Sequence, residues 1–102
     1  MNAEAKTAFL TQFPIFSSLS DEERTSMANL MEHKVKPRYS FIYMPGEPSD
    51  TIYFLSKGIV KIGTHSGDGK EVIKALIHPL AMFGELGLVG EAERQDFAQV
   101  LR

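Results

Sequence analysis

Short apolar runs separated by glycine- and proline-containing turns make up the chain after Val35, and this alternation constrains the fold more than any other feature. The runs occupy residues 41–44, 51–55, 59–63, 71–77 and 96–101. The Gly-Asp-Gly sequence at residues 67–69 predicts a hairpin turn, for which residues 71–77 are the return strand. Several short strands at this spacing predict an antiparallel β-sandwich or β-barrel.

The first third of the chain is predicted to be helical. Residues 3–10 favour a short helix, which Pro14 ends because proline breaks a helix interior. Ser20 and Glu23 have the spacing of a capping box, so we expect a second helix to start at Ser20.

The second helix is expected to pack through one apolar stripe. Met27, Leu30 and Met31 fall at positions i, i+3 and i+4 of a helical repeat. Pro37 restricts the residues before it, so the helix should stop near residues 32–33.

Composition limits the function classes. The 102 residues are enough for one domain, and 11 basic against 13 acidic residues give a net charge of −2, which argues against a non-specific nucleic-acid binder. The absence of cysteine excludes disulfides and thiolate chemistry. No apolar run approaches the roughly 18 residues of a membrane span, and no secretory signal pattern precedes the first helix. We therefore expect a cytoplasmic protein without membrane attachment.

Residues 83–94, FGELGLVGEAER, carry the strongest functional signal. Gly84 and Glu85 are expected to open a short helix, whose free N–H groups and dipole favour an anion. The Glu85 carboxylate can accept hydrogen bonds from hydroxyls, and the Arg94 guanidinium can clamp a phosphate. The pattern therefore suits a small anionic ligand that also carries hydroxyl groups.

Asp96 conflicts with such a site, because a carboxylate has the wrong charge beside a phosphate. On an extended segment Arg94 and Asp96 share a face, which Ala98 and Val100 continue as a barrel lining. Asp96 either pairs with Arg94 and takes the place of the anion, or turns aside and leaves Arg94 to a ligand. A carboxylate about 5 Å from a phosphate costs roughly 3 kcal/mol at an effective dielectric of about 20, or about a hundredfold in affinity. We therefore expect weak phosphate binding or a different ligand.

Catalytic and metal sites are not expected. His33, His65 and His78 form no H-x-H or H-x3-H pair, which weighs against a cupin-like metalloenzyme. Ser66 and Asp68 accompany His65 on one hairpin tip, without the separate buried support of a catalytic triad. The chain is therefore predicted not to be an enzyme.

Four segments in chain order resemble the cyclic nucleotide-binding domain, specifically the sensor half of Crp/Fnr-type transcription regulators. They are FPIF with Leu19 at the opening, the hairpin of residues 45–62, the DGKE turn of residues 68–71, and residues 83–94. The resemblance implies a mainly β fold: an antiparallel double-stranded β-helix (jelly-roll-like) barrel with N-terminal helices and a short phosphate-cassette helix. In one sensor domain of residues 1–102, the helices would span residues 1–35 and the barrel residues 36–102.

The same resemblance implies a cyclic nucleotide such as cAMP as ligand. Gly84 would be a backbone donor, Glu85 would accept from the ribose 2′-hydroxyl, and Arg94 would clamp the phosphate. Leu86 would add its backbone N–H, and Gln95 a backbone or side-chain amide.

The sequence departs from the family pattern at three places. Tyr39 stands where a glycine is usual, and Leu80-Ala81 replaces a usual Gly-Asp pair. Gln95-Asp96 replaces the usual small pair after the cassette arginine.

The expected function is a non-enzymatic ligand-sensing domain that controls a DNA-binding domain absent from this chain. The family's sensor domain continues with a further strand and helices, so the chain resembles a truncated fragment of a longer regulator. An uncovered strand edge would favour a homodimer. The alternative is a ligand-free oligomerisation or interaction module, in which Arg94 and Asp96 are internal structure.

Overall fold

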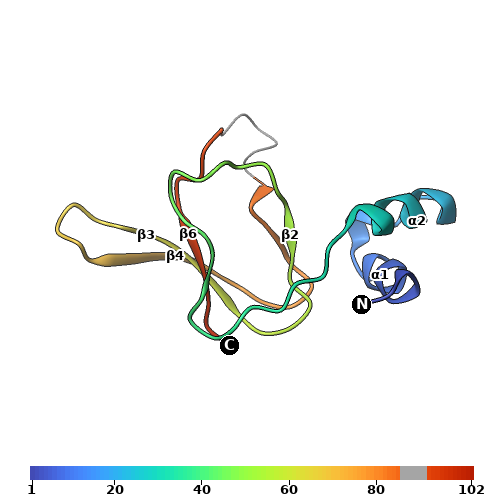
Figure 1. The fold of residues 1–102 in the computed structure, drawn as a ribbon, viewed down its shortest axis with the longest axis horizontal. Coiled ribbons are helices and arrows are strands. Elements are labelled where there is room, and N and C mark those ends of the chain that lie inside the picture. Colours follow the sequence, from blue (N-terminus) through green and yellow to red (C-terminus); the bar gives the residue numbers. More distant parts are fainter. Residues whose placement is uncertain (86–91) are drawn as a thin grey trace. The chain divides into compact units, whose positions relative to one another are not determined.

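The computed structural model of the chain describes residues 1–85 and 92–102. They form two compact units, Met1–Val35 and Lys36–Arg102. The first unit carries the helices and the second carries the strands (Figure 1).

The helical unit contains α1 (Ala3–Leu10), the 3-10 helix η1 (Pro14–Phe16) and α2 (Asp21–Leu30). The predicted capping box is confirmed at the start of α2. The Ser20 hydroxyl accepts from the Glu23 N–H at 3.1 Å, and the Glu23 carboxylate accepts from the Ser20 N–H at 2.9 Å. Two otherwise unsatisfied N–H groups are thereby paired, which fixes where α2 begins.

The end of α2 and its apolar stripe differ from the prediction. The helix ends at Leu30 rather than near residues 32–33, because Met31 is already extended. The Met31 carbonyl accepts from the Lys6 ammonium at 2.6 Å, which ties this point of the chain to α1. Leu30 is 86% exposed, so the predicted stripe is wrong there, and Ala28 is the buried residue of α2.

The second unit is built from antiparallel strands, which confirms the predicted fold class. The strands are β1 (Phe41–Tyr43), β2 (Tyr53–Phe54), β3 (Val60–His65), β4 (Glu71–Ile77), β5 (Met82–Phe83) and β6 (Phe97–Val100). They form a four-stranded sheet in the order β1-β6-β3-β4 and a two-stranded sheet of β2 and β5. Of these, β5 was not predicted from the sequence.

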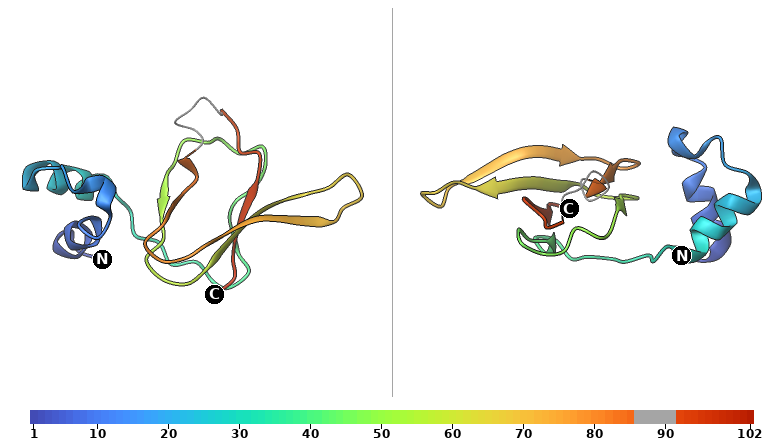
Figure 2. Two further views of the ribbon diagram at one scale, coloured as in Figure 1. Left: turned by 180° about the vertical axis from the view of Figure 1, so that it is seen from behind. Right: turned by 90° about the horizontal axis from the view of Figure 1, so that it is seen from above.

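The predicted hairpin is formed by β3 and β4. They pair from Val60 with Ile77 to His65 with Glu71, and they run side by side beyond the other strands (Figures 1 and 2). The register shifts once: Ile62 pairs with Ala75 but Gly63 pairs with Ile73. Lys74 is the extra residue of this β-bulge, and a bulge changes the direction of side chains.

The core of the second unit contains residues from both sheets. Tyr43, Val60 and Ala98 of the four-stranded sheet cluster with Phe83 of the two-stranded sheet. The two sheets therefore face each other across this cluster. Ala98 and Val100 are buried, as predicted for a lining face of the last strand. Phe97 is also fully buried and packs edge-to-face against another phenylalanine, so β6 contributes to packing on both faces.

Two residues with side chains hold left-handed backbone conformations. Tyr39 has a φ of 69° and Leu80 has a φ of 68°. Both stand where the family pattern has glycine. The Tyr39 N–H donates to the Val100 carbonyl and the Leu80 N–H to the Leu55 carbonyl, each at 2.8 Å. These hydrogen bonds hold a conformation that costs about 1–2 kcal/mol for a residue with a Cβ.

Candidate functional site

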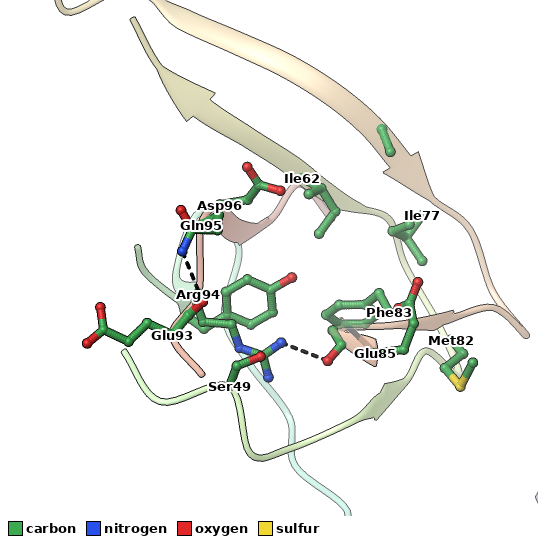
Figure 3. Close-up of a pocket in the computed structure, with 13 residues that line it drawn as sticks. Ser49, Ile62, Ile77, Met82, Phe83, Glu85, Glu93, Arg94, Gln95 and Asp96 are labelled. Carbon is green, nitrogen blue, oxygen red and sulfur yellow. Dashed lines mark hydrogen bonds between the residues drawn. The ribbon is translucent and has the colours of Figure 1, made fainter. Parts of the chain in front are cut away.

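A pocket of about 170 Å³ lies in the second unit beside Arg94 (Figure 3). Strands of both sheets and the segment that leads into β6 border it. Its lining residues are Tyr43, Ser49, Ile62, Ala75, Ile77, Met82, Phe83, Gly84, Glu85, Glu93, Arg94, Gln95 and Asp96. Apolar side chains of β3, β4 and β5 and several charged side chains, Arg94 among them, therefore line the same pocket.

The Arg94 side chain is buried and held in one orientation. It is 6% exposed. One terminal nitrogen donates to the Gly84 carbonyl at 2.7 Å, and the other donates to the Thr51 carbonyl at 2.5 Å. The guanidinium carbon lies 4.2 Å from the centre of the Tyr43 ring, a cation–π distance. Backbone carbonyls and an aromatic face thus fix the guanidinium at the pocket wall.

The backbone around Arg94 is paired with the turn that precedes β2. The Arg94 N–H donates to the Glu47 carbonyl at 2.7 Å, and the Arg94 carbonyl accepts from the Gly46 N–H at 2.8 Å. Pro48 and Glu93 form an antiparallel bridge beside them. Two motifs that are far apart in the sequence therefore meet at the site.

Gly84 is required at its position by conformation and by space. Its φ is +78°, in the left-handed region. A Cβ there would lie 3.0 Å from one terminal nitrogen of Arg94 and 3.2 Å from the Tyr53 ring. Glycine therefore allows the arginine to approach the backbone closely.

The charge of Arg94 has no carboxylate partner among residues 1–85 and 92–102. Within the same residues, its Nε is buried without a hydrogen-bond partner. A buried cation with an unused donor is costly unless an anion completes it. The part of the pocket beside Arg94 therefore favours a negatively charged ligand.

Asp96 does not pair with Arg94. Its carboxylate lies 2.8 Å from the Lys74 ammonium, with side-chain exposures of 15% for Asp96 and 51% for Lys74. Figure 3 shows the Asp96 carboxylate directed away from the Arg94 guanidinium, toward the β3–β4 side. Of the two arrangements expected from the sequence, internal pairing with Arg94 is therefore wrong, and Asp96 turns aside.

The other predicted site residues lie at the pocket or outside the described chain. Glu85 is exposed and borders the pocket. Gln95 also borders it, and its side-chain amide donates to the Glu93 carbonyl at 3.4 Å. Leu86 and the remainder of the expected cassette helix lie outside the described residues.

Two groups at the site, from Thr51 and Tyr43, were not predicted from the sequence. Thr51 contributes through its backbone carbonyl, for which no side-chain signal exists. Tyr43 lies in a predicted strand, and strand alternation alone could have placed it on the inner face. Burial raises the pKa of the Tyr43 hydroxyl, although the nearby Arg94 opposes the rise. Tyr43 therefore stays a neutral phenol beside the guanidinium.

No helix in residues 1–85 and 92–102 has the length and apolar character that crossing a membrane requires. In the same part of the chain, no three histidine, aspartate or glutamate side chains are grouped as a metal site would need.

The model of the cyclic nucleotide-binding domain family matches residues 33–102. The match covers more than half of the chain and includes every pocket residue named above. The chain belongs to the cyclic nucleotide-binding domain family.

Its relatives include Crp-like transcription regulators. The chain is 28% identical over 92 residues to the CRP-like cAMP-activated global transcriptional regulator of Mycobacterium tuberculosis. The aligned region covers 90% of the chain and 41% of the regulator. It is 32% identical over 86 residues to the cyclic AMP receptor protein of Thermus thermophilus, covering 83% of the chain and 39% of that protein. The chain thus spans about two-fifths of the length of these relatives.

A solved structure supports the fold independently. The sensor domain of the transcriptional regulator DNR from Pseudomonas aeruginosa superposes with a TM-score of 0.90, over 97% of this chain and 67% of that one. The two sequences are 20% identical. The likeness therefore supports the fold alone.

Proposed function

We propose that the chain is a non-enzymatic sensor domain that binds a cyclic nucleotide, with cAMP as the first candidate, in the pocket beside Arg94. The observation that carries this proposal is the buried guanidinium without a carboxylate partner among the described residues. Arg94 lines the pocket, and its buried Nε has no hydrogen-bond partner among the described residues. A cyclic phosphate would supply the missing negative charge and acceptor oxygens.

The remaining roles are those that the resemblance to the family implies. Glu85 would accept a hydrogen bond from the ribose 2′-hydroxyl. Backbone N–H groups of Gly84 and Leu86 and an amide of Gln95 would donate to phosphate oxygens. The pocket volume of about 170 Å³ is below the roughly 300–1,000 Å³ of complete small-molecule sites. It suits the phosphate and ribose, while the base would extend past the pocket.

In the whole protein, the bound nucleotide would control a DNA-binding domain outside this chain. This part of the proposal is based on two relatives, which are named as a cAMP-activated transcriptional regulator and a cyclic AMP receptor protein. A ligand that binds one arrangement of the sensor more tightly shifts the population toward it. Such a regulator would act in the cytoplasm, as a homodimer.

The alternative of a ligand-free interaction module is less well supported. In that alternative, Arg94 and Asp96 form an internal ion pair and no ligand is needed. Asp96 instead pairs with Lys74. Arg94 is left with a donor for which a ligand is the simplest partner.

Calorimetric titration with cAMP and with cGMP tests the proposal. Arg94→Lys keeps the charge but loses the planar fork, and we expect it to weaken binding by about tenfold or more. Arg38→Lys is the matched control, because it makes the same change at an exposed arginine outside the pocket lining. Binding of neither nucleotide, or equal affinities for wild type and Arg94→Lys, would overturn the proposal.

A further inference from the structure

The Lys74–Asp96 ion pair joins two strands that are not neighbours. Lys74 lies on β4 and Asp96 immediately precedes β6, and β3 lies between these strands in the sheet. The two charged groups nevertheless approach to 2.8 Å. The contact is an ion pair by distance, because this buried Asp96 oxygen makes no hydrogen bond among the described residues. The lysine therefore reaches across β3 to the edge of the pocket.

The β-bulge explains how Lys74 reaches this position. Regular alternation along β4 would put adjacent side chains on opposite faces. Because Ala75 pairs with Ile62 and Ile73 pairs with Gly63, Lys74 is the unpaired extra residue. A bulge can turn the side chain of such a residue toward the face of the sheet that it would not reach in a regular strand.

Asp96 would have a second partner if Lys74 were absent. Arg94 is two residues away, and its buried Nε has no hydrogen-bond partner among the described residues. Both Arg94 and Asp96 border the pocket. Another carboxylate nearby, Glu71, is already paired with Lys61 at 2.8 Å and does not compete for Lys74.

We infer that Lys74 is a positioning residue for the anion site. Lys74 holds the Asp96 carboxylate away from Arg94 and neutralises the charge of that carboxylate. A ligand anion can then bind to the Arg94 guanidinium. This inference rests on the proposed function, because it assigns Lys74 a role in the same site. It also resolves how a chain with Asp96 after the cassette arginine can keep a phosphate pocket.

Titration of cAMP into four forms of the 102-residue chain tests this inference. Lys74→Met retains most of the aliphatic stem and frees Asp96, and we expect it to weaken binding by about tenfold or more. Asp96→Asn should bind at least as tightly as wild type. The double variant Lys74→Met/Asp96→Asn should recover wild-type affinity to within about twofold. If the double variant stays as weak as Lys74→Met, the lysine acts on the ligand directly and the inference is wrong.

Two control variants separate the positioning role from general charge effects. Lys70→Met makes the same charge change on the exposed tip of the same hairpin and should leave binding unchanged. Lys74→Arg keeps a cation beside Asp96 and should bind like wild type. Equal weakening by Lys70→Met and Lys74→Met would overturn the inference.

A measurement without ligand separates this inference from the proposed function. The NMR signal of the Arg94 Nε–H should shift in Lys74→Met, as Asp96 turns to it, and should return toward its wild-type position in the double variant. If wild type binds no cyclic nucleotide but this pattern appears, the proposed function fails and the positioning role stands. An unchanged Arg94 signal in Lys74→Met overturns the positioning role whatever the titrations show.

Discussion

Leu80, in the turn between β4 and β5, holds a left-handed φ of 68° that favours glycine. The conformation costs a residue with a Cβ about 1–2 kcal/mol. Leu80→Gly relieves this cost, but it adds about 0.5–1 kcal/mol of conformational entropy to the unfolded chain. Leu80→Ala removes the same packing side chain and keeps the Cβ. We therefore expect the glycine variant to be more stable than the alanine variant by about 0.5–1 kcal/mol.

Comparing glycine with alanine at one position cancels the lost packing of the leucine side chain. The neighbouring residue provides a control of opposite sign, because Ala81 has no positive φ. Ala81→Gly should destabilise the chain by about 0.5–1 kcal/mol. The same pair of substitutions at Tyr39, which has a φ of 69°, should repeat the result at Leu80.

Urea unfolding followed by far-ultraviolet circular dichroism measures these differences. If alanine is as stable as glycine at both Tyr39 and Leu80, the positive φ carries no cost at these positions and the expectation is wrong. The expectation is also wrong if Ala81→Gly stabilises the chain, because glycine would then be favoured for a reason unrelated to φ.

Three further predictions address the site, the core and the helical unit. Gly84→Ala should destabilise the chain by about 1–2 kcal/mol and weaken cAMP binding, because the new Cβ meets Arg94; unchanged melting and titration would contradict this. Phe97→Ala should lower the free energy of unfolding by about 3–5 kcal/mol in urea, and a loss below about 1 kcal/mol would contradict its full burial. The hydrogen bond from the Ser20 N–H lowers the pKa of Glu23 in the folded chain. The ionised carboxylate therefore stabilises α2 at any pH above the pKa that Glu23 has in the unfolded chain. This stability is lost as the pH falls through the pKa of Glu23 in the folded chain. Glu23→Gln should show a smaller loss of helical dichroism on acidification than wild type, and equal losses would argue against the cap.

Features set by neighbouring residues were predictable from the sequence. The capping box at Ser20 depends on groups three residues apart, and the turn at residues 67–69 depends on its own glycines and aspartate. Both were expected and both are confirmed. The departures from family glycines at Tyr39 and Leu80 also marked real backbone features, since both hold positive φ.

Features that depend on distant pairing were not predictable. β5 has two residues and exists because Met82 and Phe83 pair with β2, so no local period reveals it. The sequence left Asp96 with two arrangements. The choice between them depends on Lys74, which a bulge on another strand brings within 2.8 Å.

A crystal structure of the chain grown with cAMP would show directly whether Arg94 binds the nucleotide. We expect the cyclic phosphate against the Arg94 guanidinium, with the Nε donating to it and Asp96 still paired with Lys74. A structure in which the nucleotide is absent from this pocket, or in which the Asp96 carboxylate pairs with the Arg94 guanidinium, would show that Arg94 does not hold the ligand.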